Sequence, residues 1–165
     1  MPKAVRFHEI GGPENLKIEE VPARQPGLGE AKLRVEAVGL NRAESLYYRG
    51  QYMEKPELPS RIGYEAAGVV QAVGPDVDKS WVGRRAATVP GYSQNKYGVL
   101  AEEAIVPASA LAAYPEKLSP AEAAPCGCSS SRRGARWHIS ASLHKVISSS
   151  SPRRRAAWGW LPSRL

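Results

Sequence analysis

Residues 1–125 predict a mainly β fold with a few short helices, folded as a compact barrel or sandwich. Short segments that alternate apolar and polar residues recur along this part of the chain, and clusters of glycine and proline separate them. Many short strands joined by such turns are typical of barrels and sandwiches. The 40 residues that follow, 126–165, have a different composition and predict no part of this fold.

Six segments are predicted as strands. Several alternate in polarity, and each ends near a turn such as Gly11-Gly12-Pro13 or Gly74-Pro75-Asp76. The predicted strands are Lys3–Phe7, Leu16–Val21, Ala31–Val38, Gly68–Val73, Arg84–Val89 and Glu102–Pro107.

Two short helices are predicted from their capping residues. Asn41 is a preferred N-cap, Glu44 stands three residues later as in a capping box, and Gly50 follows as a stop. Ser119 and Pro120 have the pattern of a second helix start, with Ser at the cap and Pro in the first turn.

The chain has neither an apolar run long enough to span a membrane nor the apolar stretch of a signal peptide at its amino terminus. We therefore expect a cytoplasmic protein without a membrane partner. Cys126 and Cys128 are the only cysteines, and a lone C-x-C pair supports neither a closed zinc site nor a disulfide framework.

The charge of the chain is concentrated after residue 125. Residues 1–125 carry 15 Lys and Arg against 16 Asp and Glu, whereas residues 126–165 carry 8 Lys and Arg and no acid. Serine runs and three of the four tryptophans also lie there. Two explanations are open: a genuine basic, disordered arm, or a segment translated out of frame.

A frame change is supported by back-translation. With permitted codons, Lys145–Leu165 read from the third base gives GDFVIITAASSSVGLAAIEI, and 128–137 treated alike gives QFLTAWGAL. The first has the pattern of a dinucleotide-binding strand, turn and helix. We therefore expect residues 1–125 to form one domain and residues 126–165 to be an Arg- and Ser-rich tail, out of frame and disordered.

Five motifs, in order, resemble the amino-terminal half of the medium-chain dehydrogenase/reductases, in their quinone oxidoreductase-like branch. They are MPKAVRFHEIGGPENLKIEEVP, AVGLNRAESLYYRGQY, LPSRIGYEAAGVVQAVG, VGRRAATV, and AEEAIVP followed by LSPAEAA. The resemblance implies a GroES-like catalytic barrel, normally followed by a Rossmann domain that binds NADPH. With that second domain missing from the frame as written, we expect a truncated oxidoreductase that is inactive alone and does not bind NADPH tightly.

The resemblance also implies site residues. Zinc-dependent members of the family have a catalytic Cys where this chain has Asn41 and a His where it has Tyr64, so we expect the zinc-independent branch and no metal. Hydride then passes from the nicotinamide to a quinone or activated enone. By motif position, Asn41 lies near the nicotinamide and the substrate, Tyr52 lines the substrate pocket, and Tyr64 faces the cleft. No residue is expected to act as a nucleophile with a base.

Simpler roles remain open for these residues. Asn41 can serve only as a helix cap, Tyr52 can simply cover apolar surface, and Glu65 is expected to be a paired structural carboxylate. An alternative function uses the tail: its arginines, interleaved with Trp137, Trp158 and Trp160, predict salt-sensitive binding of nucleic acid. A third is a non-catalytic barrel that associates with itself or with a full-length relative.

Overall fold

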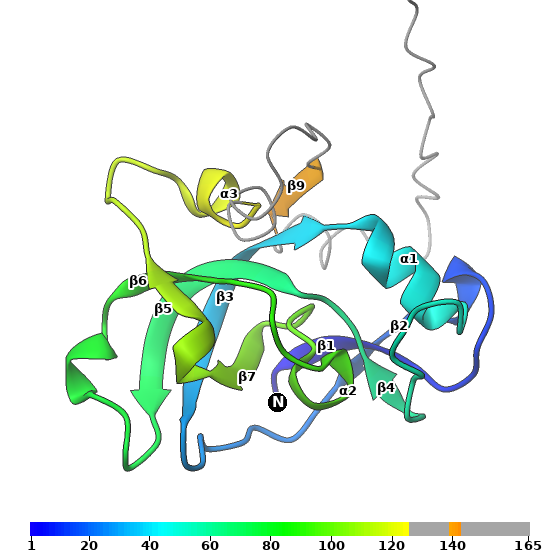
Figure 1. Cartoon of the computed structure of the whole chain (residues 1–165), viewed down its shortest axis with the longest axis horizontal. Coiled ribbons are helices and arrows are strands. Elements are labelled where there is room, and N and C mark those ends of the chain that lie inside the picture. The colour runs from blue at the N-terminus through cyan, green and yellow to red at the C-terminus, as the bar shows by residue number, and fades with distance from the viewer. Residues whose placement is uncertain (126–138, 143–165) are drawn as a thin grey trace, which may run out of the picture.

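A computed structural model of the chain describes residues 1–125 and 139–142 (Figure 1). The described part is mainly β, with short helices at its periphery, as the sequence predicts. The Arg- and Trp-rich positions on which the nucleic-acid alternative depends, and the codons that suggest a frame change, fall in 126–138 and 143–165, outside the described residues.

The strands form two antiparallel sheets. A three-stranded sheet has the order β2-β1-β4, and a larger sheet has the order β7-β3-β5-β6-β8, with β9 also paired to β3. The strands are β1 (Lys3–Phe7), β2 (Lys17–Glu20), β3 (Glu30–Leu40), β4 (Ser60–Arg61), β5 (Glu65–Val73), β6 (Arg85–Thr88), β7 (Glu103–Pro107), β8 (Leu111–Ala113) and β9 (Ile139–Ser142). The helices are α1 (Arg42–Tyr48), α2 (Gln94–Tyr97) and α3 (Pro120–Ala123), with 3-10 turns at Pro13–Asn15, Lys79–Trp81 and Ala108–Ala110.

All six predicted strands and both predicted helices are confirmed, with boundaries that differ by a few residues. α1 begins after the Asn41 cap and ends just before Gly50, whose φ of 70° suits a residue without a Cβ. α3 begins at Pro120 after a Ser119–Glu122 capping box. β4, β8, β9 and α2 are not predicted by the sequence patterns.

The segment 99–102 joins the two sheets. Leu100 accepts a backbone hydrogen bond from Val5 of β1 at 2.9 Å, and Glu102 accepts one from Val35 of β3 at the same distance. Ala101 also forms a bridge with Ala4. The two sheets are therefore connected by backbone pairing as well as by side-chain packing.

The main core lies between the strands of the larger sheet and the segments that cover it. Its buried side chains include Leu33, Val38, Val70 and Val106 from β3, β5 and β7. Along β3, Ala31, Leu33 and Val35 alternate as a half-buried strand requires, and the register shift after Val35 brings Val38 into the same core. Gly68 allows β3 and β5 to approach each other at a register shift, because a Cβ there would lie 1.9 Å from the Arg34 carbonyl oxygen.

β9 lies beyond the predicted end of the fold. β7 pairs with the first half of β3, from Glu30 to Arg34, and β9 pairs with Ala37–Leu40. Figure 1 shows β9 and α3 together above this end of β3. Backbone pairing to an open strand edge requires no particular side chain, which explains why composition predicts no strand here.

No helix in the described ranges combines the length and apolar character needed to cross a bilayer.

Candidate functional site

A polar cluster connects the end of β3, the start of α1 and the start of β5. Asn41 forms a capping box with Glu44 at the start of α1. The Nδ2 atom of Asn41 donates a hydrogen bond to Oε2 of Glu65 at 2.9 Å. Glu65 is fully buried, and its hydrogen bond confirms the expectation of a paired carboxylate. Asn41 therefore caps α1 and also binds the first residue of β5.

The Glu65 carboxylate needs the glycine at position 39. Gly39 is opposite Glu65 in the ladder between β3 and β5. A Cβ at position 39 would lie 2.4 Å from Oε2 of Glu65 and 3.0 Å from its Cβ. The absence of a side chain on β3 thus leaves the volume in which Glu65 meets Asn41.

Glu44 joins Asn41 to Tyr64. It is 5% exposed, and its two carboxylate oxygens accept hydrogen bonds from the backbone N–H of Asn41 at 2.7 Å and of Tyr64 at 3.2 Å. Burial raises the pKa of Glu44 to about 7, because hydrogen bonds from three backbone N–H groups, those of Glu44, Asn41 and Tyr64, offset only part of the desolvation and the Glu65 charge adds to it. Glu44 therefore changes its charge near neutral pH.

The Tyr64 backbone is fixed on both sides. Its N–H is bound by Glu44, and its carbonyl oxygen accepts hydrogen bonds from Oγ1 of Thr88 at 2.9 Å and from the Tyr92 hydroxyl. Burial raises the pKa of the Tyr64 hydroxyl well above its usual value, and the Gln94 side chain opposes that shift. The hydroxyl therefore stays protonated at physiological pH and remains a hydrogen-bond donor.

Four tyrosine rings form a continuous row, which we call the tyrosine row: Tyr52, Tyr64, Tyr92 and Tyr97. Neighbouring ring centroids are 6.3, 5.8 and 6.0 Å apart in that order, with interplanar angles between 58° and 88°. These are the tilted and edge-to-face arrangements that aromatic pairs prefer. Four polarisable rings, each with a hydroxyl group, therefore lie side by side although they come from different parts of the sequence.

α2 contacts the tyrosine row through Gln94, next to Tyr64, and contributes Tyr97 to it. Oε1 of the fully buried Gln94 accepts a hydrogen bond from the Gly63 N–H at 2.8 Å, while Nε2 has no well-formed hydrogen bond to any described residue. Glu54 accepts hydrogen bonds from the Gln94 N–H at 3.1 Å and from the Ser93 hydroxyl. The loop that carries Tyr52 is thus tied to the helix next to Tyr64.

The structure brings the three sequence-predicted site residues together. Tyr52 and Tyr64 are in ring contact, and Glu44 links Asn41 to Tyr64. The sequence predicts Glu44 as a capping acid but not as this link. It gives no signal for Tyr92 or Gln94, since both lie in a glycine- and proline-rich segment without periodicity. What Asn41, Tyr52 and Tyr64 bind stays a prediction.

Within residues 1–125 and 139–142, no group of three or more His, Cys, Asp or Glu side chains has the arrangement of a metal site. The Asn41 side chain donates to Glu65, and the Tyr64 backbone N–H donates to Glu44.

Comparison with known proteins gives consistent matches to the barrel. Residues 27–116 match the alcohol dehydrogenase GroES-like domain. The chain is 41% identical to a quinone oxidoreductase of Pseudomonas aeruginosa over 108 residues, which is 64% of this chain and 33% of that protein. It is 36% identical to a 2-haloacrylate reductase of a Burkholderia species over 121 residues, which is 72% of this chain and 35% of the relative.

A solved structure extends the likeness to three dimensions. The crystal structure of Escherichia coli quinone oxidoreductase complexed with NADPH superimposes with a TM-score of 0.65 and 30% sequence identity, and covers 74% of this chain and 36% of that one. The chain thus spans about a third of the length of the proteins that it matches.

Proposed function

This chain belongs to the medium-chain dehydrogenase/reductase superfamily through its alcohol dehydrogenase GroES-like domain, and on that premise we propose that residues 1–125 form the substrate-side domain of an NADPH-dependent reductase of quinones or activated enones. The single observation that carries the proposal is the linkage of Tyr52, Tyr64 and Asn41 through ring contact and the Glu44 carboxylate. The matched relatives, a quinone oxidoreductase and a 2-haloacrylate reductase, support an electron-poor acceptor.

The tyrosine row suits a flat acceptor ring. Tyr52 and Tyr64 present tilted rings 6.3 Å apart, and a quinone placed against them gains aromatic contact without an ionic partner. The Tyr64 hydroxyl is protonated at neutral pH, as a tyrosine ordinarily is, and can donate a hydrogen bond to a carbonyl oxygen. In this proposal the tyrosines orient the acceptor and exclude water, and Asn41 borders the nicotinamide.

Asn41 is proposed to border the nicotinamide, but the described helices offer no site for the pyrophosphate of NADPH. When bound, that cofactor supplies the hydride, which passes to the acceptor while a proton completes the reduction. A pyrophosphate requires a glycine-rich turn at a helix amino terminus. None of α1, α2 and α3 in the described chain begins in that way, since residues 41, 93 and 119 before them are Asn, Ser and Ser. We therefore propose that the 165-residue chain alone neither binds NADPH tightly nor turns over substrate.

We also propose that the protein is zinc-independent and that residues 126–165 are an out-of-frame tail. Self-association and a cytoplasmic location are proposals as well. Zinc independence rests on the amide of Asn41 and the phenol of Tyr64 at the two ligand positions. The out-of-frame tail rests on the change of composition after residue 125.

The acceptor site is tested by a nuclear magnetic resonance titration of the isotopically labelled 165-residue chain. Tetramethyl-1,4-benzoquinone is the suitable probe, because its substituted ring carbons cannot add the Cys126 and Cys128 thiols. We expect saturable shifts of the amides of Asn41, Tyr52 and Tyr64, with the amides of β2 unchanged. Shifts confined to other residues, or none in a chain with a dispersed spectrum, would exclude this acceptor site.

A further inference from the structure

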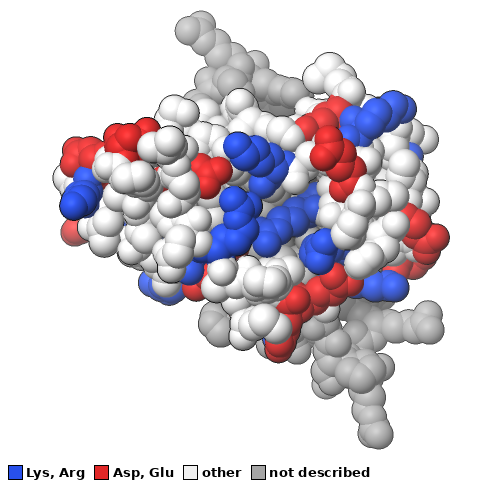
Figure 2. Space-filling model, turned by 90° about the horizontal axis from the view of Figure 1, so that it is seen from below, with Lys and Arg blue, Asp and Glu red and all other residues white. Residues whose placement is uncertain are grey.

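A basic groove lies on the face of the barrel shown in Figure 2. Lysine and arginine side chains gather there in a hollow on the surface. The groove has a volume of about 290 Å³ and is lined by Arg6, Val21, Pro22, Arg24, Pro59, Arg61, Asn95 and Lys96. Four of these eight side chains are cationic and none is acidic. The residues come from β1, β4, α2 and the segment that follows β2.

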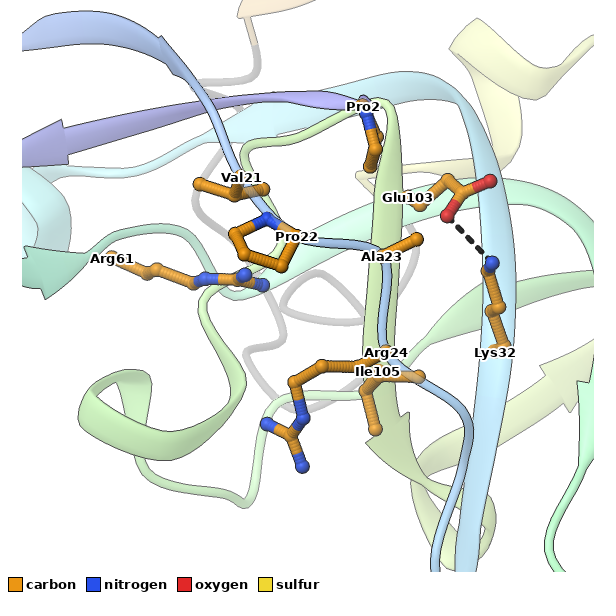
Figure 3. A pocket seen from close by; sticks show the side chains of 9 residues that line it. All are labelled: Pro2, Val21, Pro22, Ala23, Arg24, Lys32, Arg61, Glu103 and Ile105. Atoms are coloured by element: carbon orange, nitrogen blue, oxygen red, sulfur yellow. Dashed lines mark ion pairs between the residues drawn. The ribbon is translucent and has the colours of Figure 1, made fainter.

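Arg61 lines the basic groove from β4. It also lines the smaller adjoining pocket drawn in Figure 3, as does Pro22, whereas Lys32 points toward Glu103. Lys32 and Glu103 are paired at 2.6 Å. Within the part of the chain that the structure describes, no carboxylate lies within ion-pair distance of Arg61. Arg61 is thus a partly buried charge that the described fold does not neutralise.

The electrostatic environment of Arg61 is unfavourable without a ligand. Burial is the largest cause that lowers its pKa, and the charges of Arg24 and Arg6 lower the pKa further. An arginine remains protonated under these conditions, so the repulsion persists as a cost of the folded state. An anion in the groove would remove that cost.

The other three cations are only weakly paired. Arg6 is 3.5 Å from Glu19, whose other oxygen binds His8 at 2.6 Å. Arg24 and Lys96 share the buried Glu30 at 3.9 and 3.8 Å.

Glu30 itself is already engaged by the Gly27 N–H at 3.0 Å and the Tyr97 hydroxyl at 3.0 Å. Four cations therefore face two carboxylates, and the surplus is two positive charges.

We propose that the basic groove between Arg6, Arg24, Arg61 and Lys96 binds a small phosphate-bearing anion. Two uncompensated positive charges match a phosphate dianion, and the guanidinium groups of Arg61 on β4 and of Arg24 in the segment after β2 both line the groove and can donate N–H bonds to its oxygens. Asn95 is the one uncharged polar residue that lines the groove. None of the four tyrosines lines the groove, and its nearest link to the tyrosine row is Lys96, which lies 4.8 Å over the Tyr97 ring.

The groove favours a compact ligand over a nucleic acid strand. Neither the groove nor the adjoining pocket is lined by an aromatic side chain on which a base could stack. Glu19 and Glu30, in contact with its cations, limit the run of positive charge that a phosphate backbone would follow. Free phosphate and the phosphate group of an ester remain two sources of the same chemistry.

Calorimetric titration of the full 165-residue chain tests the proposal, with pyrophosphate, orthophosphate, glucose 6-phosphate and malonate at one ionic strength. Arg61→Gln and Arg24→Gln remove groove cations, and because 53% of the Arg24 side chain is exposed, Arg24→Gln is expected to keep the fold. The matched control is Arg34→Gln, a 50% exposed arginine of β3 that lies outside the groove and pairs with Glu36. Circular dichroism checks each variant.

We expect pyrophosphate to bind with a dissociation constant below about 1 mM, each groove variant to weaken it about tenfold, and Arg34→Gln to change it less than about twofold. Tighter binding of glucose 6-phosphate than of orthophosphate would assign the site to phosphate esters, and the reverse order to free phosphate. Absence of saturable binding, binding unaffected by both groove substitutions, or malonate bound as tightly as pyrophosphate would overturn the proposal.

Discussion

Asn41 and Glu65 are joined by a hydrogen bond of 2.9 Å that connects the first turn of α1 to the first residue of β5. The bond anchors the start of α1 to the sheet at the point where β3 ends. It also supplies the buried Glu65 carboxylate with a hydrogen-bond donor. The stability of the barrel and the placement of the proposed site therefore depend on the same side chain.

Replacement of Asn41 by alanine is expected to lower the free energy of unfolding by about 1 to 3 kcal/mol, because it removes a helix cap and a donor to a buried carboxylate. Urea unfolding measures the change. Asn15→Ala is the matched control, since the Asn15 amide makes only a 3.5 Å contact with the Glu9 carbonyl oxygen at the surface. Equal stability of the two variants would show that the Asn41 to Glu65 bond has no net value.

A methyl group at position 39 is expected to destabilise the fold by about 1 to 3 kcal/mol, because the new Cβ would overlap the Glu65 carboxylate. Gly91→Ala is the control, since no atom lies within 4 Å of a Cβ built there. Thermal unfolding of Gly39→Ala and Gly91→Ala distinguishes the two positions. A Gly39→Ala variant as stable as the wild type would mean that Glu65 can occupy another position.

Because the pKa of Glu44 is raised in the folded chain, we expect the stability of the fold to depend on pH. Below pH 4.5 the carboxyl is protonated in both the folded and unfolded chain; between 4.5 and about 7 the unfolded chain has released the proton and the folded chain has not. The Glu44 contribution to stability therefore falls as the pH rises through this window, by about 1 to 3 kcal/mol in total, and is constant above it.

Glu44→Gln removes this titration. As the pH increases from 4.5 to 7, the free energy of unfolding of the wild type is expected to fall relative to that of Glu44→Gln. Urea unfolding at several pH values measures this difference. Glu9→Gln, at an exposed surface position, is the control and is expected to show no such trend. A pH-independent difference for Glu44→Gln would contradict the raised pKa.

The Tyr52 ring is expected to contribute directly to acceptor binding. Tyr52→Ala removes the ring that contacts Tyr64, and we expect it to weaken binding of tetramethyl-1,4-benzoquinone at least about fivefold. Tyr52→Phe retains the ring and is expected to remain within about twofold of the wild type. Loss of binding in both variants, or in neither, would contradict a role for the aromatic face.

Local patterns in the sequence predict the elements that are defined by their own residues. β1 coincides with the predicted Lys3–Phe7, and the Asn41 and Glu44 pattern predicts the start of α1. β4 has only two residues and exists because β1 pairs with Ser60 and Arg61, a contact between distant segments. β8 contains two alanines, which have little preference for strands.

The candidate site is predictable to a similar extent. Family resemblance singles out Asn41, Tyr52 and Tyr64, and the structure brings them together. Tyr92 and Gln94 join them because α2 folds back onto the loop that contains Glu54, through hydrogen bonds across about forty positions in sequence that no periodicity encodes. Arg61 likewise lacks a signal, since its isolation from carboxylates depends on the arrangement of three other segments.

The single turn of α2 lies between the tyrosine row and the basic groove. Tyr97 is the last ring of the tyrosine row and Gln94 binds Gly63 next to Tyr64, while Asn95 and Lys96 between them line the basic groove. So short a helix has no stability of its own, and its orientation is set by its contacts on both sides. A ligand in the basic groove would therefore contact the same turn whose Gln94 holds Gly63 next to Tyr64, and the two places are linked through the four residues of α2.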